Sequence, residues 1–367
     1  GTTTSYDQGI VLKDYQKLFG QGQDLTLGDI TGENAFDQTI IVKGGDDQYS
    51  KITKSFSGGD SFLLQYMATL LNKNTGTVTV ANNNVIKGLE ISSSNDNNSS
   101  TYSYGSGIAI FNKTGSVISN NKLEGNSVNG IQIVSNNGNA ISNTISNNHI
   151  SNSDYEGIVA RSYDSSSQTN MISSNTISSN DWGSYFSSYD SSTQNNAFSN
   201  NTISNNDFDG IYSLSRNSSN LTNRISNNVI SGNSASGLSL WSSETSNLTN
   251  VISGNTISAN ASDGIHFESL STSIQNIAAQ NNNISNNSGR ALFIKKESGA
   301  AAIIDFGLGS LSSVGGNNIA GNVNLDGASI VAQKNYWGQA SGINPAELTL
   351  SNGASLDDNN HLTENPF

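Results

Sequence analysis

The sequence contains no cysteine, only two prolines and few charges, since Asp, Glu, Lys and Arg make up 12% of its 367 residues. The lack of cysteine excludes disulfides, thiolate zinc sites and cysteine nucleophiles. No run of about 18 apolar residues occurs, so no transmembrane helix is expected. The net charge of −13 argues against DNA, RNA or anionic membrane as a partner, because phosphate recognition needs clustered Lys and Arg.

Hydrophobic residues are also scarce, at 34% of the chain. A low apolar content is typical of disordered chains, but those are rich in charge as well, and this chain is not. Asn and Ser stand where other proteins have apolar and charged residues, and together they form about a third of the sequence. A bias of this size needs a structural reason.

A repeat of 26 or 27 residues runs through the chain. Its first landmark is an isoleucine in an Asn-Thr-Ile-Ser phrase or a variant of it, at positions 150, 177, 203, 230, 257 and 284. Its second landmark is a glycine about seven residues later, followed by an apolar strand, as at Gly157, Gly183, Gly210, Gly237 and Gly264. At least seven consecutive coils follow this pattern.

The repeat predicts short strands rather than helices. Residues 210–214 and 237–241 alternate apolar and polar side chains with period two, and each repeat has room for about three strands between Asn, Ser and Gly turns. Coiling such repeats stacks each strand on its counterpart one coil earlier and encloses a narrow core. Asn tolerates left-handed backbone and hydrogen-bonds to its copy in the next coil. We therefore predict an all-β parallel solenoid.

Three segments carry a family resemblance. Residues 9–22 resemble an opening coil, residues 82–91 a regular coil, and Asn335-Tyr336-Trp337-Gly338 with Leu362 and Pro366 a closing segment. In these segments the chain resembles the right-handed parallel β-helix proteins of the pectin lyase-like class, including β-helix passengers of bacterial surface proteins. The resemblance implies right-handed coils and a secreted or cell-surface protein. It implies no particular activity, because one fold serves many functions.

The ends of the chain depart from the regular repeat. Asp60 followed by a run of apolar residues predicts a short helix that caps or covers the solenoid. No linker separates a second domain, so we expect one β-helix domain over 1–367. Its parts are opening coils at 1–60, the helix at 60–72, regular coils at 73–298, and irregular coils with a C-terminal closure at 299–367.

One outward face is expected to gather aromatic and charged side chains. The second and fourth residues after each glycine should point outward, and consecutive coils lie about 4.8 Å apart, so these residues form columns. Sugar rings stack on aromatic side chains, and their hydroxyls suit polar groups, so the columns predict a polysaccharide or a cell-surface glycan as partner. The candidate binding residues are Trp182, Tyr185, Tyr212, Trp241, Phe293, Arg161 and Lys295.

The same face offers candidate catalytic groups, namely Asp209, Asp263, His266 and Glu268. Asp209 and Asp263 lie two coils apart, about 9.6 Å by the strand spacing, which suits an inverting glycosidase. Alternatively Asp263 and Glu268 pair near His266. Lyase or epimerase chemistry would need a base and a cation, such as His266 with Arg161 or Lys295. Against catalysis, the constant period of the coils leaves no long loops to build a cleft.

Three functions remain open at this stage. The first is a monomeric glycan-binding module or adhesive passenger, the second a polysaccharide hydrolase or lyase, and the third a structural spacer at the cell surface. Neither a metal nor another cofactor is expected, because the three histidines lie far apart in the sequence. A Ca²⁺ site at Asp181, Asp207 and Asp209 is the one alternative.

Overall fold

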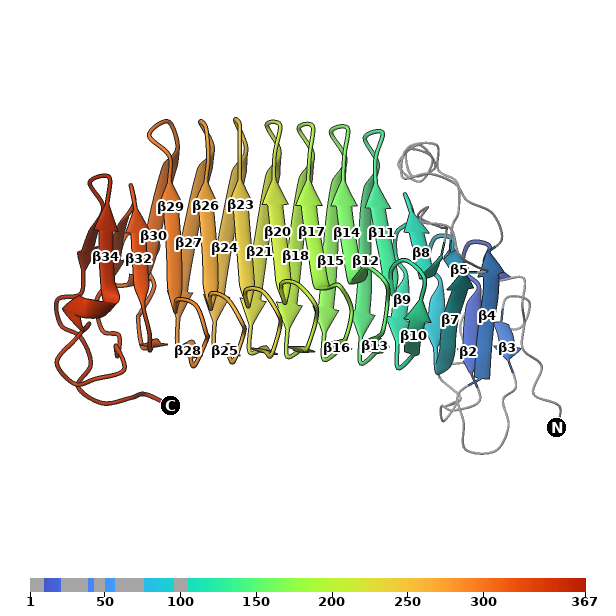
Figure 1. The fold of residues 1–367 in the computed structure, drawn as a ribbon. Coiled ribbons are helices and arrows are strands. Elements are labelled where there is room, and N and C mark those ends of the chain that lie inside the picture. The colour runs from blue at the N-terminus through green and yellow to red at the C-terminus, as the bar shows by residue number, and fades with distance from the viewer. Residues whose placement is uncertain (1–9, 21–38, 43–49, 57–75, 96–104) are drawn as a thin grey trace.

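The computed structural model describes residues 10–20, 39–42, 50–56, 76–95 and 105–367. In this part of the chain three parallel sheets wind around one axis, and successive coils lie side by side from the N-terminal to the C-terminal end (Figure 1). Within the repeat each coil contributes one strand to each sheet, paired in register with the coils before and after it. The predicted all-β parallel solenoid is confirmed.

The described strands fall into three sheets. Sheet 1 contains β1 (Ile10–Val11), β5 (Gly76–Val80), β8 (Ser106–Phe111), β11 (Ile131–Ser135), β14 (Glu156–Ser162), β17 (Trp182–Ser188), β20 (Ile211–Ser215), β23 (Leu238–Ser242), β26 (Ile265–Ser269), β29 (Leu292–Lys296), β32 (Val323–Asp326) and β34 (Leu348–Ser351). Sheet 2 contains β4 (Ser50–Phe56), β7 (Leu89–Asn95), β10 (Lys122–Asn126), β13 (His149–Ser151), β16 (Thr176–Ser178), β19 (Thr202–Ser204), β22 (Val229–Ser231), β25 (Thr256–Ser258), β28 (Asn283–Ser285) and β31 (Asn318–Ile319). Sheet 3 contains β2 (Lys17–Gly20), β3 (Thr39–Val42), β6 (Val85–Lys87), β9 (Val117–Ser119), β12 (Ala140–Ser146), β15 (Ser167–Ser173), β18 (Thr193–Ser199), β21 (Asn220–Ser226), β24 (Asn247–Ser253), β27 (Ile274–Gln280), β30 (Ala301–Gly307), β33 (Ser329–Ala332) and β35 (Ser355–Asp357).

Helical structure in the described residues is limited to one 3₁₀ turn at Pro345–Glu347. The helix predicted for residues 60–72 lies outside the described residues, and so does most of the opening segment predicted for residues 1–60. Over the residues that are described, no helix is long and apolar enough to cross a membrane.

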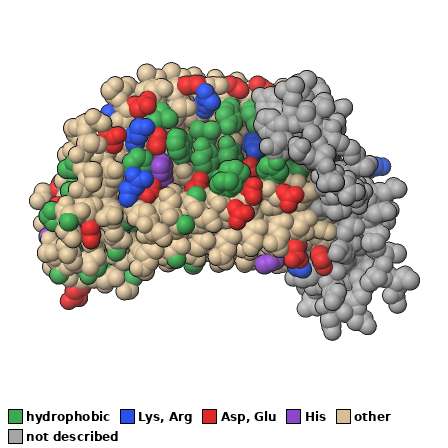
Figure 2. Space-filling view, in the orientation of Figure 1, with side chains coloured by type: hydrophobic (Ala, Val, Ile, Leu, Met, Phe, Trp, Pro, Cys, Tyr) green, Lys and Arg blue, Asp and Glu red, His purple; other side chains and the backbone are tan. Residues whose placement is uncertain are grey.

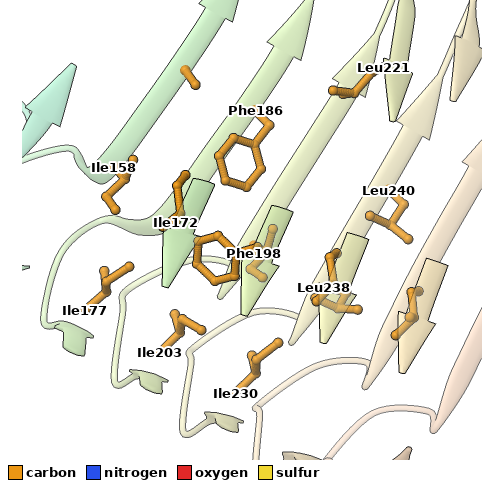
Figure 3. Close-up of a cluster of buried hydrophobic side chains, with 14 of the residues drawn as sticks. Ile158, Ile172, Ile177, Phe186, Phe198, Ile203, Leu221, Ile230, Leu238 and Leu240 are labelled. Atoms are coloured by element: carbon orange, nitrogen blue, oxygen red, sulfur yellow. The ribbon is translucent and has the colours of Figure 1, made fainter. Parts of the chain in front are cut away.

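The core is a set of apolar columns that run along the axis. The repeat isoleucines, such as Ile177, Ile203 and Ile230, are fully buried and lie one above the other, and the side chains from sheets 1 and 3 face them (Figure 3). Each coil needs only a few such residues because its neighbours cover it on both sides. The low hydrophobic content of the sequence therefore suffices for a closed core.

Asparagine has the two roles that the composition suggested. Asn147, Asn200 and Asn227 adopt left-handed backbone at the turn before sheet 2, each with φ of 56°. The next residue in each coil is a buried asparagine whose Nδ2 donates to Oδ1 of its copy one coil later, typically at 3.0 Å. This asparagine ladder consists of Asn121, Asn148, Asn175, Asn201, Asn228, Asn255, Asn282, Asn317 and Asn335.

The repeat glycines mark the point where consecutive coils approach most closely. A Cβ atom on Gly210 would lie 2.6 Å from Cγ2 of Ile230 and 2.8 Å from the carbonyl oxygen of Gly237. Equivalent contacts surround Gly183 and Gly237. A side chain here would push two coils apart. Glycine therefore recurs at the beginning of the sheet 1 strand or directly before it.

The C-terminal coils, for which the sequence predicts irregularity from residue 299, continue all three sheets with turns of a different kind. The buried carboxylate of Asp305 accepts four backbone N–H groups, from Gly307, Gly309, Leu311 and Ser313, and so organises the loop that follows β30. Trp337, in the predicted closing segment, is buried as part of the core.

Candidate functional site

The outward residues of sheet 1 line up as the sequence predicted. Strand pairing places Tyr185 beside Tyr212, Tyr212 beside Ser239, Ser239 beside His266, and His266 beside Phe293. A second column runs through Arg161, Ser187, Leu214, Trp241, Glu268 and Lys295. A third, before the glycines, contains Glu156, Trp182, Asp209, Ser236, Asp263 and Arg290. We call these three columns, from β14 to β29, the ladder face.

The ladder face is where side chains of several kinds gather. Figure 2 shows hydrophobic side chains over this part of the surface, with histidine, basic and acidic side chains beside them. Toward the N-terminus the outward residues Ala109, Phe111 and Val134 are buried in a second hydrophobic cluster, against which Tyr163 packs, and Val159 is buried too. The accessible part of the face therefore begins at Arg161 and Tyr185.

Aromatic rings dominate the N-terminal half of the ladder face. Tyr185 stacks on Tyr212 with ring centroids 4.9 Å apart, and Trp182 stacks on Phe208 at 4.4 Å. Arg161 lies over the Tyr185 ring, and its Nη2 donates to Oε1 of Glu156 at 2.9 Å. Burial and the neighbouring Tyr189 raise the pKa of the Tyr185 hydroxyl, so it stays protonated at neutral pH.

A charged cluster occupies the C-terminal half. His266 lies between two carboxylates, with Nδ1 3.0 Å from Oδ2 of Asp263 and Nε2 3.1 Å from Oε1 of Glu268. Arg290 donates to both oxygens of Asp263, from Nε at 2.8 Å and from Nη2 at 2.9 Å. Lys295 approaches Glu268 at 3.5 Å. We call these five residues the histidine cluster.

Two rings enclose the histidine of this cluster. The indole of Trp241 stacks on His266 with centroids 5.5 Å apart and an interplanar angle of 8°, and Phe293 lies on the other side at 4.6 Å. Arg290 in turn covers the Phe293 ring at 3.9 Å. The cluster is thus held by ion pairs and by stacking together.

The protonation states of the cluster follow from these contacts. Burial opposes a charge on His266, but hydrogen bonds to Asp263 and Glu268 outweigh burial and raise its pKa. Burial also opposes a charge on Asp263, yet hydrogen bonds from His266 and Arg290 lower its pKa to about 2. Asp263 is therefore ionised at neutral pH and fully engaged, so it cannot serve as a general acid there.

The carboxyl group of Asp209 differs from that of Asp263 in its pKa and in its contacts. It lies partly buried between the aromatic half and the histidine cluster, and it accepts the backbone N–H of Ser236 at 2.8 Å. Burial raises its pKa to about 6, although the Ser236 bond and nearby His266 lower it. A carboxyl group with this pKa exchanges protons close to neutral pH, as a general acid or base must.

The ring ladder is interrupted beside Asp209. In the described part of the chain no ring contact joins Tyr212 to Trp241, because small Ser239 occupies the position next to Tyr212. The Trp241 Nε1 donates to the hydroxyl of Ser239 at 2.9 Å and folds the indole over that serine. One ring face of Tyr212 is covered by Tyr185, and on the side toward Ser239 no ring of a described residue contacts it.

The candidates from the sequence therefore separate into two groups. The structure brings Asp263, His266 and Glu268 into direct contact, in the alternative arrangement that the sequence offered, whereas Asp209 makes no contact with Asp263. Arg161 and Lys295, expected to neutralise a substrate carboxylate, each face a protein carboxylate instead. Their roles in binding or catalysis stay predictions.

Several residues of the site escaped the sequence argument as site residues. Arg290 holds Asp263, Phe208 extends the Trp182 stack, and Tyr163 stacks on Tyr189 at 5.3 Å in the turn after the ladder strands. Tyr163 and Tyr189 lie 26 residues apart in the repeat, so their column was readable from the period alone. The hydrogen bonds from Arg290 to Asp263 depend on side-chain conformation, so the period alone does not predict them.

The ladder face has a pocket at its edge, and no metal site is found near it among the described residues. Among the described residues no group of three or more histidine and carboxylate side chains is arranged to hold a metal ion, so the Ca²⁺ alternative at Asp181, Asp207 and Asp209 gains no support. A pocket of about 310 Å³ opens at the C-terminal edge of the face, lined by Lys295, Lys296, Glu297, Ser298, Asp326, Gly327 and Asn352.

Comparisons with known proteins bear on the fold. A family model described as right handed beta helix region matches residues 144–336, in agreement with the predicted handedness, and the model of a family of unknown function, DUF1565, matches residues 10–223. The crystal structure of pectate lyase Pel9A is similar at 11% identity, over 98% of this chain and 80% of that one, with a TM-score of 0.42. The A-module of mannuronan C-5 epimerase AlgE4 from Azotobacter vinelandii is similar at 12% identity, over 96% and 85%, with a TM-score of 0.40. No curated protein matches the sequence.

Proposed function

The chain belongs to the right-handed β-helix family and to the DUF1565 family, and on this premise we propose that it binds a polysaccharide along the ladder face. The proposed ligand runs across the coils, so that successive sugar units meet successive coils. The face supplies rings, hydroxyls and carboxylates in one continuous strip, which is the set of groups that sugars contact.

The observation that carries the proposal is the contrast between columns. Every coil of a solenoid makes the same demands on its residues, and the buried isoleucines and asparagines recur accordingly. The ladder columns instead change from coil to coil, for example Tyr212, Ser239 and His266 in one of them. Side chains that differ where the fold is constant are not required by the fold, and a strip of half-buried rings on an outer face suits a ligand that stacks on aromatic groups.

The interruption beside Asp209 is the best place for a sugar ring. The half-buried ring of Tyr212 lies there, Asp209 lies three residues before it in the same coil, and Trp241 lies on the next coil. An apolar sugar face would pack on Tyr212 while a sugar hydroxyl donates to the Asp209 carboxylate. Elsewhere the rings stack on one another, so the ligand would meet their edges and the tyrosine hydroxyls.

The proposal extends to the setting of the protein. A polysaccharide-binding β-helix with an acidic, cysteine-free surface suits a secreted or cell-surface protein, acting as a monomer because one face of one chain provides the whole strip. The sequence resemblance to bacterial β-helix passengers agrees with an adhesive role.

Binding is tested by retention on a panel of immobilised polysaccharides. We expect retention on at least one polymer and its loss in Tyr212→Ala and Trp241→Ala. Met171→Ala, at an exposed position on sheet 3, is the matched control and should bind like the wild type. Retention that survives both ladder substitutions, or retention on no polymer, would contradict the proposal and favour a structural spacer.

A second candidate, a polysaccharide-degrading enzyme, is favoured by one observation, the raised pKa of Asp209. Incubation with the same polymers, followed by mass spectrometry and absorbance at 235 nm, detects it. Unsaturated ends would indicate a lyase and saturated ends a hydrolase. Product formation that stops in Asp209→Asn would make the protein an enzyme, whereas retention without product leaves it a binding module.

A further inference from the structure

Every cation in the three ladder columns is already paired with a carboxylate of the protein. Arg161 binds Glu156 at 2.9 Å, Arg290 binds Asp263 through two nitrogens, and Lys295 faces Glu268 at 3.5 Å. The remaining cation, His266, contacts Asp263 and Glu268 with its two ring nitrogens. No cation of the three columns is left for a charged ligand, and Lys296, which follows Lys295 at the end of β29, donates to the backbone carbonyl groups of Glu297 and Ala300.

These pairs are costly to open. Asp263 is 1% exposed and Glu156 is 5% exposed, so a ligand that took their cations would leave a buried carboxylate without a partner. Breaking such a pair is strongly destabilising, because it leaves a buried charge without compensation. A uronic-acid polymer would have to do so, because each of its sugar units brings a carboxylate that needs a cation.

The electrostatic field of the whole protein also disfavours the binding of a polyuronate. The net charge of −13 repels a polyanion, and the ladder face itself adds Asp209, whose carboxyl group is in no ion pair with a described cation, although His266 lies near it. Besides these pairs the face offers a hydrogen-bond acceptor at Asp209 and the half-buried ring of Tyr212. These groups suit hydroxyls and C–H surfaces.

We propose that the ligand of the ladder face is an uncharged, hydroxyl-rich glycan and that the paired charges exclude polyuronates. The inference rests on the proposed function and narrows it to a substrate class. In this scheme the ion pairs are not contacts that wait for substrate. They fix the rings of Trp241, His266 and Phe293 and keep the face free of unpaired positive charge.

The first test compares neutral and acidic polymers on the wild-type protein. Immobilised glucan, xylan and mannan represent uncharged chains, and polygalacturonate and alginate represent polyuronates. We expect retention on a neutral polymer, changing less than about twofold between 50 and 500 mM salt, because contacts without charge are little screened. Retention on a polyuronate that equals or exceeds that on every neutral polymer overturns the inference and leaves the proposed function standing. Retention on neither class overturns both.

A second test releases one cation without changing its position. In Glu156→Gln the side chain keeps its shape but loses its charge, so Arg161 becomes an unpaired cation beside Tyr185. Glu244→Gln is the matched control, because it makes the same change of net charge at the exposed Arg216–Glu244 pair outside the ladder columns. We expect Glu156→Gln to be retained on polygalacturonate at least about threefold more than Glu244→Gln at low salt.

The thermal midpoint of each variant shows whether that variant is folded, and only folded variants are compared for retention. If Glu156→Gln does not fold, Glu268→Gln takes its place, because it frees Lys295 on a different coil. Equal polyuronate retention by a folded ladder variant and by Glu244→Gln would show that paired charge does not set the selectivity, and would overturn the inference.

Discussion

Two stripes of side chains run along the axis of the solenoid and differ in kind. The asparagine ladder repeats one buried residue in coil after coil, and its side chains hydrogen-bond to their own copies and to backbone carbonyl groups. The ladder face has the same spacing but presents rings in its N-terminal half and ion pairs in its C-terminal half. The comparison teaches that uniform columns maintain the stack, whereas varied columns are free to carry specificity.

The largest effect is expected inside the uniform column. The Asn228 side chain makes four hydrogen bonds, donating to Phe198 and Asn255 and accepting twice from Asn201. Asn228→Ala leaves these buried partners unsatisfied and should lower the free energy of unfolding by about 4 kcal/mol. Thermal and denaturant unfolding measure it. Asn220→Ala, exposed on sheet 3, should cost less than about 0.5 kcal/mol, and equal losses would refute the contrast.

A smaller loss is expected in the histidine cluster. Asp263→Asn leaves Arg290 and His266 without their buried carboxylate, so we expect a loss of about 3 kcal/mol at pH 7. The pKa of Asp263 is lowered to about 2 from its usual 3.8, so its contribution is present above pH 4 and is lost as the pH falls toward 2. The difference between wild type and variant, followed by chemical denaturation from pH 7 to 2, should shrink accordingly. A difference independent of pH would rule out this assignment.

Changes to the rings should separate binding from stability. Tyr212→Ala and Trp241→Ala are each expected to weaken retention on the cognate polysaccharide about tenfold, which corresponds to about 1.4 kcal/mol. Isothermal titration with a soluble oligosaccharide measures the change, and Met171→Ala serves again as control. If the ladder variants lose thermal stability but no affinity, the rings serve only to stack.

The smallest effect concerns Asp209. Because burial raises its pKa from 3.8 to about 6, the folded state holds its proton more tightly than the unfolded chain, and the wild type loses stability as pH rises from 4 to 6. Asp209→Asn removes this loss, on the order of 1 kcal/mol. The free energy of unfolding, measured at pH 4 and at pH 6.5, should increase for the variant relative to the wild type between these two pH values. A constant difference would mean that the carboxyl group titrates normally.

The periodic features were predictable from the sequence because each coil repeats the same demands. The isoleucine and glycine landmarks, the outward columns and the role of asparagine all follow from a period of about 27 and from strand geometry, and the structure has them in register. The break in the repeat after residue 299 is visible in the sequence, whereas the organisation of the following loop around the buried carboxylate of Asp305 is not. That arrangement belongs to a single coil and leaves no periodic signal.

The sequence by itself determined the solenoid, its narrow core and the set of side chains on the ladder face, because stacking identical coils converts a period into columns. Only the tertiary structure decided how those side chains use one another. It paired Arg161 with Glu156, placed His266 between Asp263 and Glu268, and left Asp209 outside these ion pairs. The physical reason is that a column position fixes where a side chain starts, while its conformation, its burial and the charges of neighbouring coils decide what it reaches.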